Sequence, residues 1–146
     1  MDDLGRGLMA GFVATIVISL LMALRLSMGL MPWFYPIEIL NLSAQELFGT
    51  PNSRWVGWAI HFVVGTGIWG VLFGWIVERL PGDTYTRRGI LFGGIVWFVV
   101  MITVFPAAGS GFFALGFGWG ISVWTLIYHL IFGFSLGATY GWLRSL

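Results

Sequence analysis

The chain alternates long apolar stretches with short polar segments, and this pattern predicts four helices that cross a membrane. The stretches run from about Gly7 to Met28, Val56 to Val77, Gly89 to Phe105 and Gly120 to Leu143. Each is close to the roughly 20 helical residues that span the hydrocarbon core of a bilayer. None alternates polar and apolar residues over about 10 positions, as the strands of a membrane β-barrel do. We therefore predict an all-α, polytopic membrane protein with four transmembrane helices.

The segment between the first two stretches predicts a shorter, amphipathic helix. An aromatic and proline-rich run, Pro32 to Pro36, precedes it. One helical face is apolar and the opposite face is polar: Ile37, Leu40, Ala44, Leu47 and Phe48 against Glu38, Asn41, Gln45 and Glu46. Such a helix is typical of one that lies along a membrane surface. We expect an interfacial helix in the first outer loop.

Short motifs recur in the same order in the two halves of the chain. An Arg-Gly pair, a histidine four residues before a glycine, and an aromatic-Gly-Trp triplet each occur twice. The pairs are Arg6-Gly7 and Arg88-Gly89, His61 with Gly65 and His129 with Gly133, and Phe73-Gly74-Trp75 and Tyr140-Gly141-Trp142. Two hairpins in one orientation imply a parallel repeat about the membrane normal. We predict one membrane domain, 1–146, with repeats over about 5–80 and 87–146.

Small residues recur at every fourth position within the predicted crossings. They are Gly7, Gly11, Thr15 and Ser19 in the first, Thr66, Gly70 and Gly74 in the second, and Gly133, Gly137 and Gly141 in the fourth. Helices in lipid gain little from the hydrophobic effect when they associate, so close backbone approach supplies the attraction. We expect these residues to pack helices of this chain together, with docking onto a foreign helix as the alternative.

Composition agrees with the membrane prediction and excludes several functions. Only 9% of the residues are charged, and no Asp, Glu, Lys or Arg lies between Arg88 and Arg144. The absence of cysteine excludes disulfides and thiolate chemistry. A net charge of +1 gives no basic patch for nucleic acid.

The arginines predict the orientation of the chain. Five fall on the side of the two termini, namely Arg6, Arg79, Arg87, Arg88 and Arg144, and two, Arg25 and Arg54, fall on the other side. The positive-inside rule then places both termini in the cytoplasm. Near the outer end of the first helix, the long stem of Arg25 would let its guanidinium snorkel to the interface.

Two histidines within the crossings, His61 and His129, are the candidate binding residues. They occupy matching repeat positions at about the same depth in the outer half of the membrane. An intramembrane histidine needs a hydrogen-bond partner, so a structural bond between helices is the first interpretation. The alternative is a tetrapyrrole, because neutral imidazole ligates haem iron and the neighbouring glycines leave a flat hollow. We expect no metal set and no cofactor, with haem b or chlorophyll as the alternative.

The stretches Gly57-Trp58-Ala59-Ile60-His61 and His129-Leu130-Ile131-Phe132-Gly133, together with four short crossings, resemble a family of small bacterial membrane proteins of unknown function. The resemblance covers most of the chain except the outer loops. It implies a bacterial inner-membrane protein and implies no activity.

The segment from Pro106 to Trp119 bears on function because it carries no charge. Since such a loop is poorly suited to water, we expect it to dip into the interface or to be covered by another protein. Its large aromatic residues are then candidate partner contacts: Phe112, Phe113, Phe117 and Trp119.

The first functional hypothesis is a non-catalytic accessory or structural subunit of a larger respiratory or photosynthetic membrane complex. Its partners would be the lipid bilayer and other integral subunits or copies of itself. The second is an electron-transfer subunit that binds haem b or chlorophyll through His61 and His129. A small channel or transporter is the third, although no Asp, Glu or Lys lies within the crossings. We expect no enzyme, because no nucleophile–base pair is visible.

Overall fold

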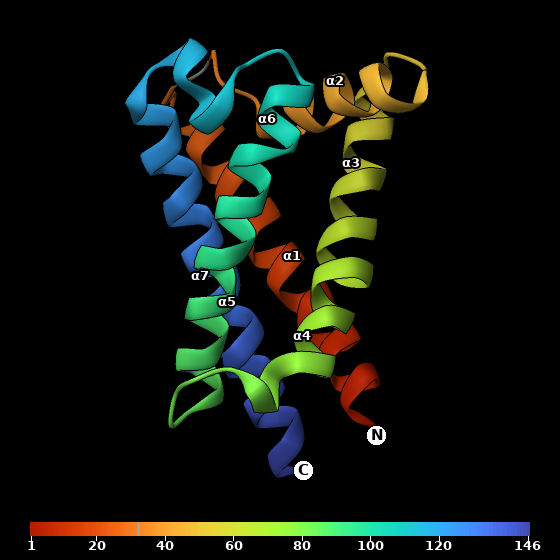
Figure 1. The fold of residues 1–146 in the computed structure, drawn as a ribbon, viewed down its shortest axis with the longest axis vertical. Coiled ribbons are helices and arrows are strands. Elements are labelled where there is room, and N and C mark those ends of the chain that lie inside the picture. Colours follow the sequence, from red (N-terminus) through yellow and green to blue (C-terminus); the bar gives the residue numbers. More distant parts are fainter. Residues whose placement is uncertain (32) are drawn as a thin grey trace.

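A computed structural model describes residues 1–31 and 33–146, and the described residues form helices without strands (Figure 1). Pro32, the first residue of the run before the amphipathic helix, lies outside them. Four helical segments are long and apolar enough to cross a membrane: Asp3–Ser27, Arg54–Arg79, Tyr85–Ala107 and Trp119–Ser145. The predicted all-α fold with four crossings is confirmed, and the chain is a multi-pass membrane protein.

The four crossings differ in how regular they are. The first and fourth are single helices, α1 (Asp3–Ser27) and α7 (Trp119–Ser145). The second is a continuous series of α3 (Arg54–Phe62), the π-helix η1 (Val63–Gly70), α4 (Val71–Ile76) and the 3₁₀ turn η2 (Val77–Arg79). The third is α5 (Tyr85–Ile102) followed by α6 (Val104–Ala107). Outside the crossings lie α2 (Pro36–Phe48) and the 3₁₀ segment η3 (Phe112–Phe117).

The third crossing ends differently from the sequence prediction, which stopped it at Pro106. The helix instead breaks at Thr103, whose φ and ψ are −121° and −64°, and Pro106 lies inside the short α6. Proline lacks an N–H, and its ring clashes with the carbonyl four residues earlier. The break therefore falls one turn before the proline.

Glycines let two pairs of crossings approach until their backbones touch. A Cβ atom on Gly7 of α1 would meet the carbonyl oxygen of Gly70, and one on Gly11 would lie 2.7 Å from the Gly70 Cα. In the second half, a Cβ atom on Gly89 of α5 would meet the carbonyl oxygen of Gly133 on α7. These glycines pack helices of this chain, as the sequence predicts.

The other predicted small residues extend the same two contacts. A Cβ atom on Gly74 would meet the Asp3 carbonyl, one on Gly137 would meet the Tyr85 carbonyl, and one on Gly141 would contact the Tyr85 ring. In the first half, the side chain of Thr15 fills the space beside Gly65, Ser19 follows it one turn on, and the Thr66 carbonyl adjoins Gly11.

α1 crosses the bundle diagonally (Figure 1). It packs on η1 and α4 near the two chain termini, makes few contacts with α3, and also packs on α7. We call the end of the bundle that holds both termini the terminal end, and the opposite end, with α2, α6 and η3, the α2 end. The distance between α1 and α3 increases toward the α2 end. Contacts between helices therefore do not fill that half of the bundle.

α2 lies across the α2 end and packs on α3 and α6 (Figure 1). Its buried face matches the predicted apolar face only in part: Ile37 and Ala44 are buried as predicted, but so are the polar Asn41 and Ser43. Asn41 is fully buried and donates to Asn52 Oδ1 at 2.7 Å, whereas Phe48 is 79% exposed. Ser43 Oγ donates to the Val104 carbonyl of α6 at 2.8 Å. The helix is held by specific hydrogen bonds to its neighbours as well as by its apolar side.

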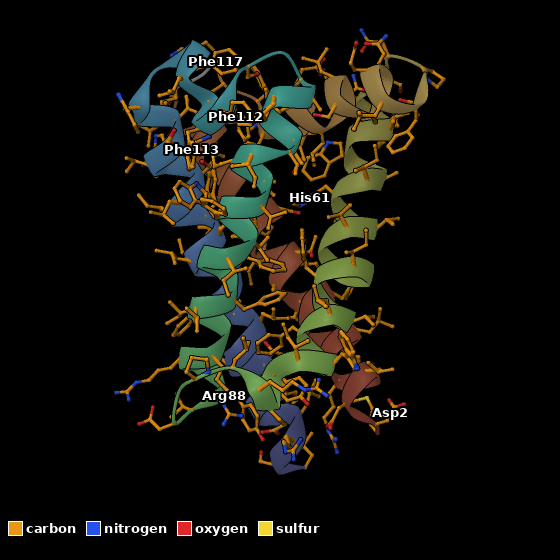
Figure 2. The ribbon with its side chains drawn as sticks, in the orientation of Figure 1. Asp2, His61, Arg88, Phe112, Phe113 and Phe117 are labelled. Carbon is orange, nitrogen blue, oxygen red and sulfur yellow. The ribbon has the colours of Figure 1, made fainter. Side chains whose placement is uncertain are left out.

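Charged side chains join all four crossings at the terminal end, which is the end where Figure 2 labels Asp2 and Arg88. Arg144 of α7 lies 3.1 Å from both Asp3 of α1 and Glu78 of η2. Glu78 also pairs with Arg88 of α5 at 2.7 Å. These groups are partly exposed, so each pair contributes only about 0–1 kcal/mol. They fix which helices meet at this end more than they stabilise it.

Arg25, predicted to snorkel, is buried inside the protein, with 5% of its surface exposed. Its guanidinium donates to the carbonyls of Met31 and Phe34, at 3.0 and 2.5 Å. Met31 has a φ of 47°, in the left-handed region that a side chain disfavours by roughly 1–2 kcal/mol. Arg25 reaches toward the α2 end as expected, but it binds the chain that leads into α2 rather than lipid headgroups.

We expect Gly133→Ala to destabilise the bundle, because its Cβ would meet the Gly89 carbonyl oxygen. Forcing an extra carbon into such a contact costs about 1–3 kcal/mol. Gly67→Ala is the matched control: it is also helical and would meet nothing within 4 Å. The measurement is the free energy of unfolding in mixed micelles. Equal effects of the two substitutions would contradict the backbone contact.

We expect Arg25→Met to loosen the connection between α1 and α2, because it leaves two buried carbonyls without their charged donor. Hydrogen bonds to charged groups contribute about 1.5–3 kcal/mol each. Amide exchange at Leu30 and Phe34, whose N–H groups are bonded within this segment, should accelerate. Arg79→Met, at an exposed site, is the control and should leave these amides unchanged.

Candidate functional site

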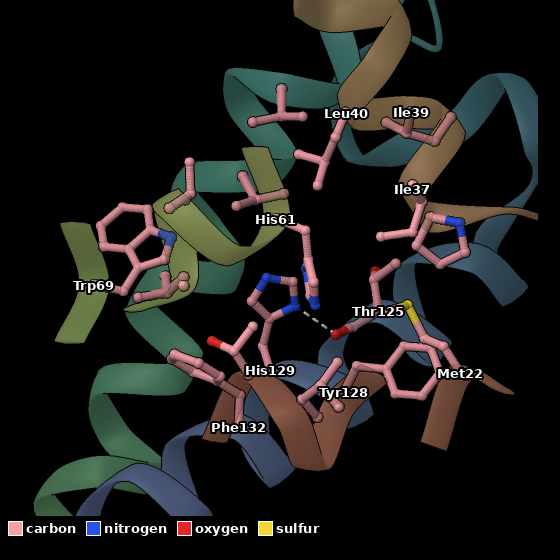
Figure 3. A pocket seen from close by; sticks show the side chains of 18 of the residues that line it. Met22, Ile37, Ile39, Leu40, His61, Trp69, Thr125, Tyr128, His129 and Phe132 are labelled. Atoms are coloured by element: carbon pink, nitrogen blue, oxygen red, sulfur yellow. Dashed lines mark hydrogen bonds between the residues drawn. The ribbon is translucent and has the colours of Figure 1, made fainter. Parts of the chain in front are cut away.

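A cavity of about 130 Å³ lies in the half of the bundle nearest the α2 end (Figure 3). Side chains of seven helical elements surround it: α1, α2, α3, η1, α5, α6 and α7. The wall is largely aliphatic, including Ile18, Ile37, Val96 and Val100. The cavity exists because α1 diverges from α3, and α2 covers the resulting space.

Aromatic side chains close the cavity toward the terminal end. Phe92 of α5 lies against Trp69 and Phe73, with ring centroids 6.3 and 5.3 Å apart. Phe73 in turn contacts Tyr140, at 5.5 Å. Nearer the α2 end, neither α3 nor η1 packs extensively against α5 among the described residues. The cavity is partly open. The side between α3–η1 and α5 is the one that no helix contact closes.

His61 projects into the cavity and is oriented by α1. Its Nε2 lies 3.1 Å from the Ser19 hydroxyl. The Ser19 hydroxyl also lies 2.8 Å from the Thr15 carbonyl, and with its hydrogen donated there it accepts from His61. Nε2 therefore carries the proton, and Nδ1 keeps an unshared electron pair. This bond joins α3 to α1, as the structural interpretation predicts.

His129 also projects into the cavity, and its partner is the backbone of its own helix. Its Nδ1 lies 2.7 Å from the Thr125 carbonyl oxygen, drawn as the dashed line in Figure 3. A carbonyl can only accept, so Nδ1 carries the proton and Nε2 keeps the electron pair. Trp97 holds this stretch of α7, donating to the Ser122 carbonyl at 3.1 Å. Unlike that of His61, this bond links no two helices.

Tyr128 is a further polar side chain of the cavity wall, which also includes Thr15 and Thr125. The residue is 8% exposed, and its hydroxyl has no hydrogen-bond partner among the described residues. Its ring stacks on Trp124, with centroids 6.0 Å apart. A buried hydroxyl of this kind costs free energy unless something binds it.

The two histidines suit axial ligation in their chemistry but not in the space available. Metal-ligating histidines donate their second ring N–H to a carbonyl or similar group, and both His61 and His129 have such a partner. A cavity of about 150 Å³, slightly larger than this one, holds a single benzene. A tetrapyrrole contains four pyrrole rings, so it does not fit with η1 and α5 in their present positions.

The π-helix η1 was not predicted, and it borders the site directly after His61. It contributes Val64, Gly65 and Trp69 to the cavity wall. π-helical turns are rare in proteins, but those that occur are often found at functional sites, because the wider turn changes the direction of the side chains. No local residue pattern in this apolar stretch signals the wider turn.

The aromatic residues predicted to contact a partner are divided by the structure. Phe112, Phe117 and Trp119 are 63%, 46% and 70% exposed, and Figure 2 shows Phe112 and Phe117 at the α2 end. Phe113 is half-buried, with its ring 5.8 Å from Trp97 and close to Phe98. Phe113 therefore belongs to the packing of η3 on α5, and the other three side chains are exposed.

These features define a small polytopic membrane protein with a ring-sized, histidine-lined cavity between its crossings. The chain belongs to a family described as a family of unknown function (DUF6789), which matches residues 1–146. The predicted membership of a family of unknown function is confirmed. No curated protein and no solved structure shows significant similarity to the chain.

We expect nitrogen NMR of the histidine side chains to show His129 protonated at Nδ1 and His61 protonated at Nε2, because of the groups they face. Ser19→Ala should change the His61 signals and leave those of His129 unchanged. An Nε2-protonated His129 would contradict the assigned hydrogen bond.

Proposed function

We propose that this chain is a non-catalytic membrane protein that binds a small, lipid-soluble ring molecule between His61 and His129. The observation that carries the proposal is an apolar cavity lined by two imidazoles, each with one ring nitrogen that has no hydrogen-bond partner among the described residues. A histidine needed only for packing would have both ring nitrogens satisfied by the protein. Here one nitrogen of each ring remains for a ligand.

The position of the cavity supports a ligand that arrives through lipid. The side on which no helix contact closes it lies between η1 and α5, both parts of membrane crossings. Hydrocarbon surrounds that side in a bilayer, so an apolar molecule can enter laterally without passing through water. A water-soluble ligand would have to lose its hydration first.

We place the protein in a bacterial inner membrane with both termini in the cytoplasm. The arginine distribution supports this orientation, since Arg79, Arg88 and Arg144 all lie at the terminal end.

A role as an accessory subunit of a larger membrane complex is a second proposal, compatible with the first. The exposed aromatic side chains of Phe112, Phe117 and Trp119 support it. Lipid or interface contact would also cover these side chains. Truncation of Trp119 that weakens co-purification of another integral subunit would favour the complex.

We expect para-fluorophenol, a single ring with one hydroxyl, to bind the protein saturably in nanodiscs. Fluorine NMR would show a bound signal absent from empty discs. Val100→Phe should abolish this signal, because Val100 lines the cavity and the larger ring fills it. Val123→Phe, at a position that is 56% exposed on α7, is the matched control and should keep it.

Two results would overturn the proposed site. One is a bound signal that persists in Val100→Phe, and the other is no saturable signal in the wild-type protein. The unfolding temperature of Val100→Phe without ligand establishes that the variant is folded. A Soret band in protein purified from its native membrane would instead favour the haem alternative.

We expect cysteines introduced at Ser145 and Pro51 to react with an impermeant maleimide from opposite sides of sealed vesicles. The chain has no native cysteine, and both positions are exposed at opposite ends of the bundle. Ser145 should react only from the cytoplasmic side. Labelling of both from one side would contradict four crossings.

A further inference from the structure

Hydrogen bonding around the two histidines restricts which molecules the cavity can hold. His129 Nδ1–H is committed to the Thr125 carbonyl, which cannot reverse its role. The electron pair on Nε2 therefore requires a donor. His61 is likewise an acceptor toward the cavity, because its Nε2–H donates to Ser19, whose own hydrogen is donated to the Thr15 carbonyl. A ligand that fits both must present hydrogens to them.

The free hydroxyl of Tyr128 adds a group that can donate or accept. It is more than nine-tenths buried and belongs to the wall of the same cavity. The remaining wall is almost wholly apolar. A ring that carries hydroxyl groups would satisfy these three polar side chains and fill the apolar space around them.

The size of the cavity limits the rest of the ligand. Its 130 Å³ accommodates about one six-membered ring, by comparison with the roughly 150 Å³ cavity that binds benzene. Any longer substituent must leave through the unclosed side between η1 and α5. That side faces hydrocarbon, so the substituent would be an apolar tail.

We propose that the cavity binds the reduced form of a membrane quinone, a quinol, and discriminates against the oxidised form. This inference rests on the proposed function. The quinol hydroxyls donate to His61 and His129, and the tail lies between η1 and α5. A quinone offers only carbonyl acceptors, to which neither imidazole can donate. The Tyr128 hydroxyl can donate to one of them, so both imidazole nitrogens and one quinone oxygen would stay unsatisfied. The fixed protons of the histidines thus make the site selective for redox state.

Binding of three probes to the full-length protein in nanodiscs tests this inference. The probes are decylhydroquinone, decylbenzoquinone and the dimethyl ether of decylhydroquinone, which share the ring and the tail but differ in hydrogen-bond donors. Bound probe is counted in excess over empty discs, under anaerobic conditions for the reduced form. We expect the hydroquinone to bind at least tenfold more tightly than the other two.

His129→Leu should reduce the preference for the hydroquinone to less than about threefold, and Val100→Phe should abolish binding of every probe. Val123→Phe should preserve both affinity and preference. If His129→Leu fails to fold, Ser19→Ala gives the second measurement, because it frees His61 to turn its proton toward a quinone and should narrow the preference.

The outcomes separate the two proposals. Equal binding of all three probes that Val100→Phe removes would overturn the quinol inference and leave the proposed function standing. Tighter binding of the quinone would do the same. No saturable binding of any probe would overturn both.

Discussion

Direct contact between helix backbones is the constraint on which the rest of this structure depends. Lipid surrounds the crossings, so burying apolar side chains between them gains little, and close packing must hold them together. Gly7 against Gly70 and Gly89 against Gly133 bring the chains to a separation at which no side chain fits. Both contacts lie in the half nearer the termini. They fix the two hairpins there, while in the opposite half α1 and α3 diverge.

The cavity follows from this divergence. α1 leaves α3 as it rises toward α7, and α2 then covers the space that opens. A covering segment needs its own attachment, which Arg25 and Ser43 provide through hydrogen bonds to backbone carbonyls. A buried arginine without a carboxylate partner in the described residues is costly, yet here its guanidinium is hydrogen-bonded to the carbonyls of Met31 and Phe34. The fold therefore lacks close packing between α1 and α3 in this half, and a cavity covered by α2 takes its place.

The chemistry of the site is decided by which groups can only accept. In a medium without water, each ring N–H must find a partner within the protein. Thr125 offers His129 a carbonyl, and Ser19 offers His61 an oxygen whose hydrogen is already used. Both imidazoles are therefore left as acceptors toward the cavity. Backbone hydrogen bonding, and not the identity of the histidines alone, sets what they can bind.

The sequence by itself determined the four crossings and the glycines that pack them, because hydropathy and spacing are local properties. It also identified His61 and His129 as candidate binding residues, but it did not determine how the two are arranged relative to each other. The sequence motif equates Gly65 with Gly133, whereas in backbone contact Gly70 is the counterpart of Gly133, so the two halves are alike in kind but not in register. The π-helix, the burial of Arg25 and the cavity were decided only by tertiary structure. Each depends on which distant segments meet, and no single stretch of sequence contains that information.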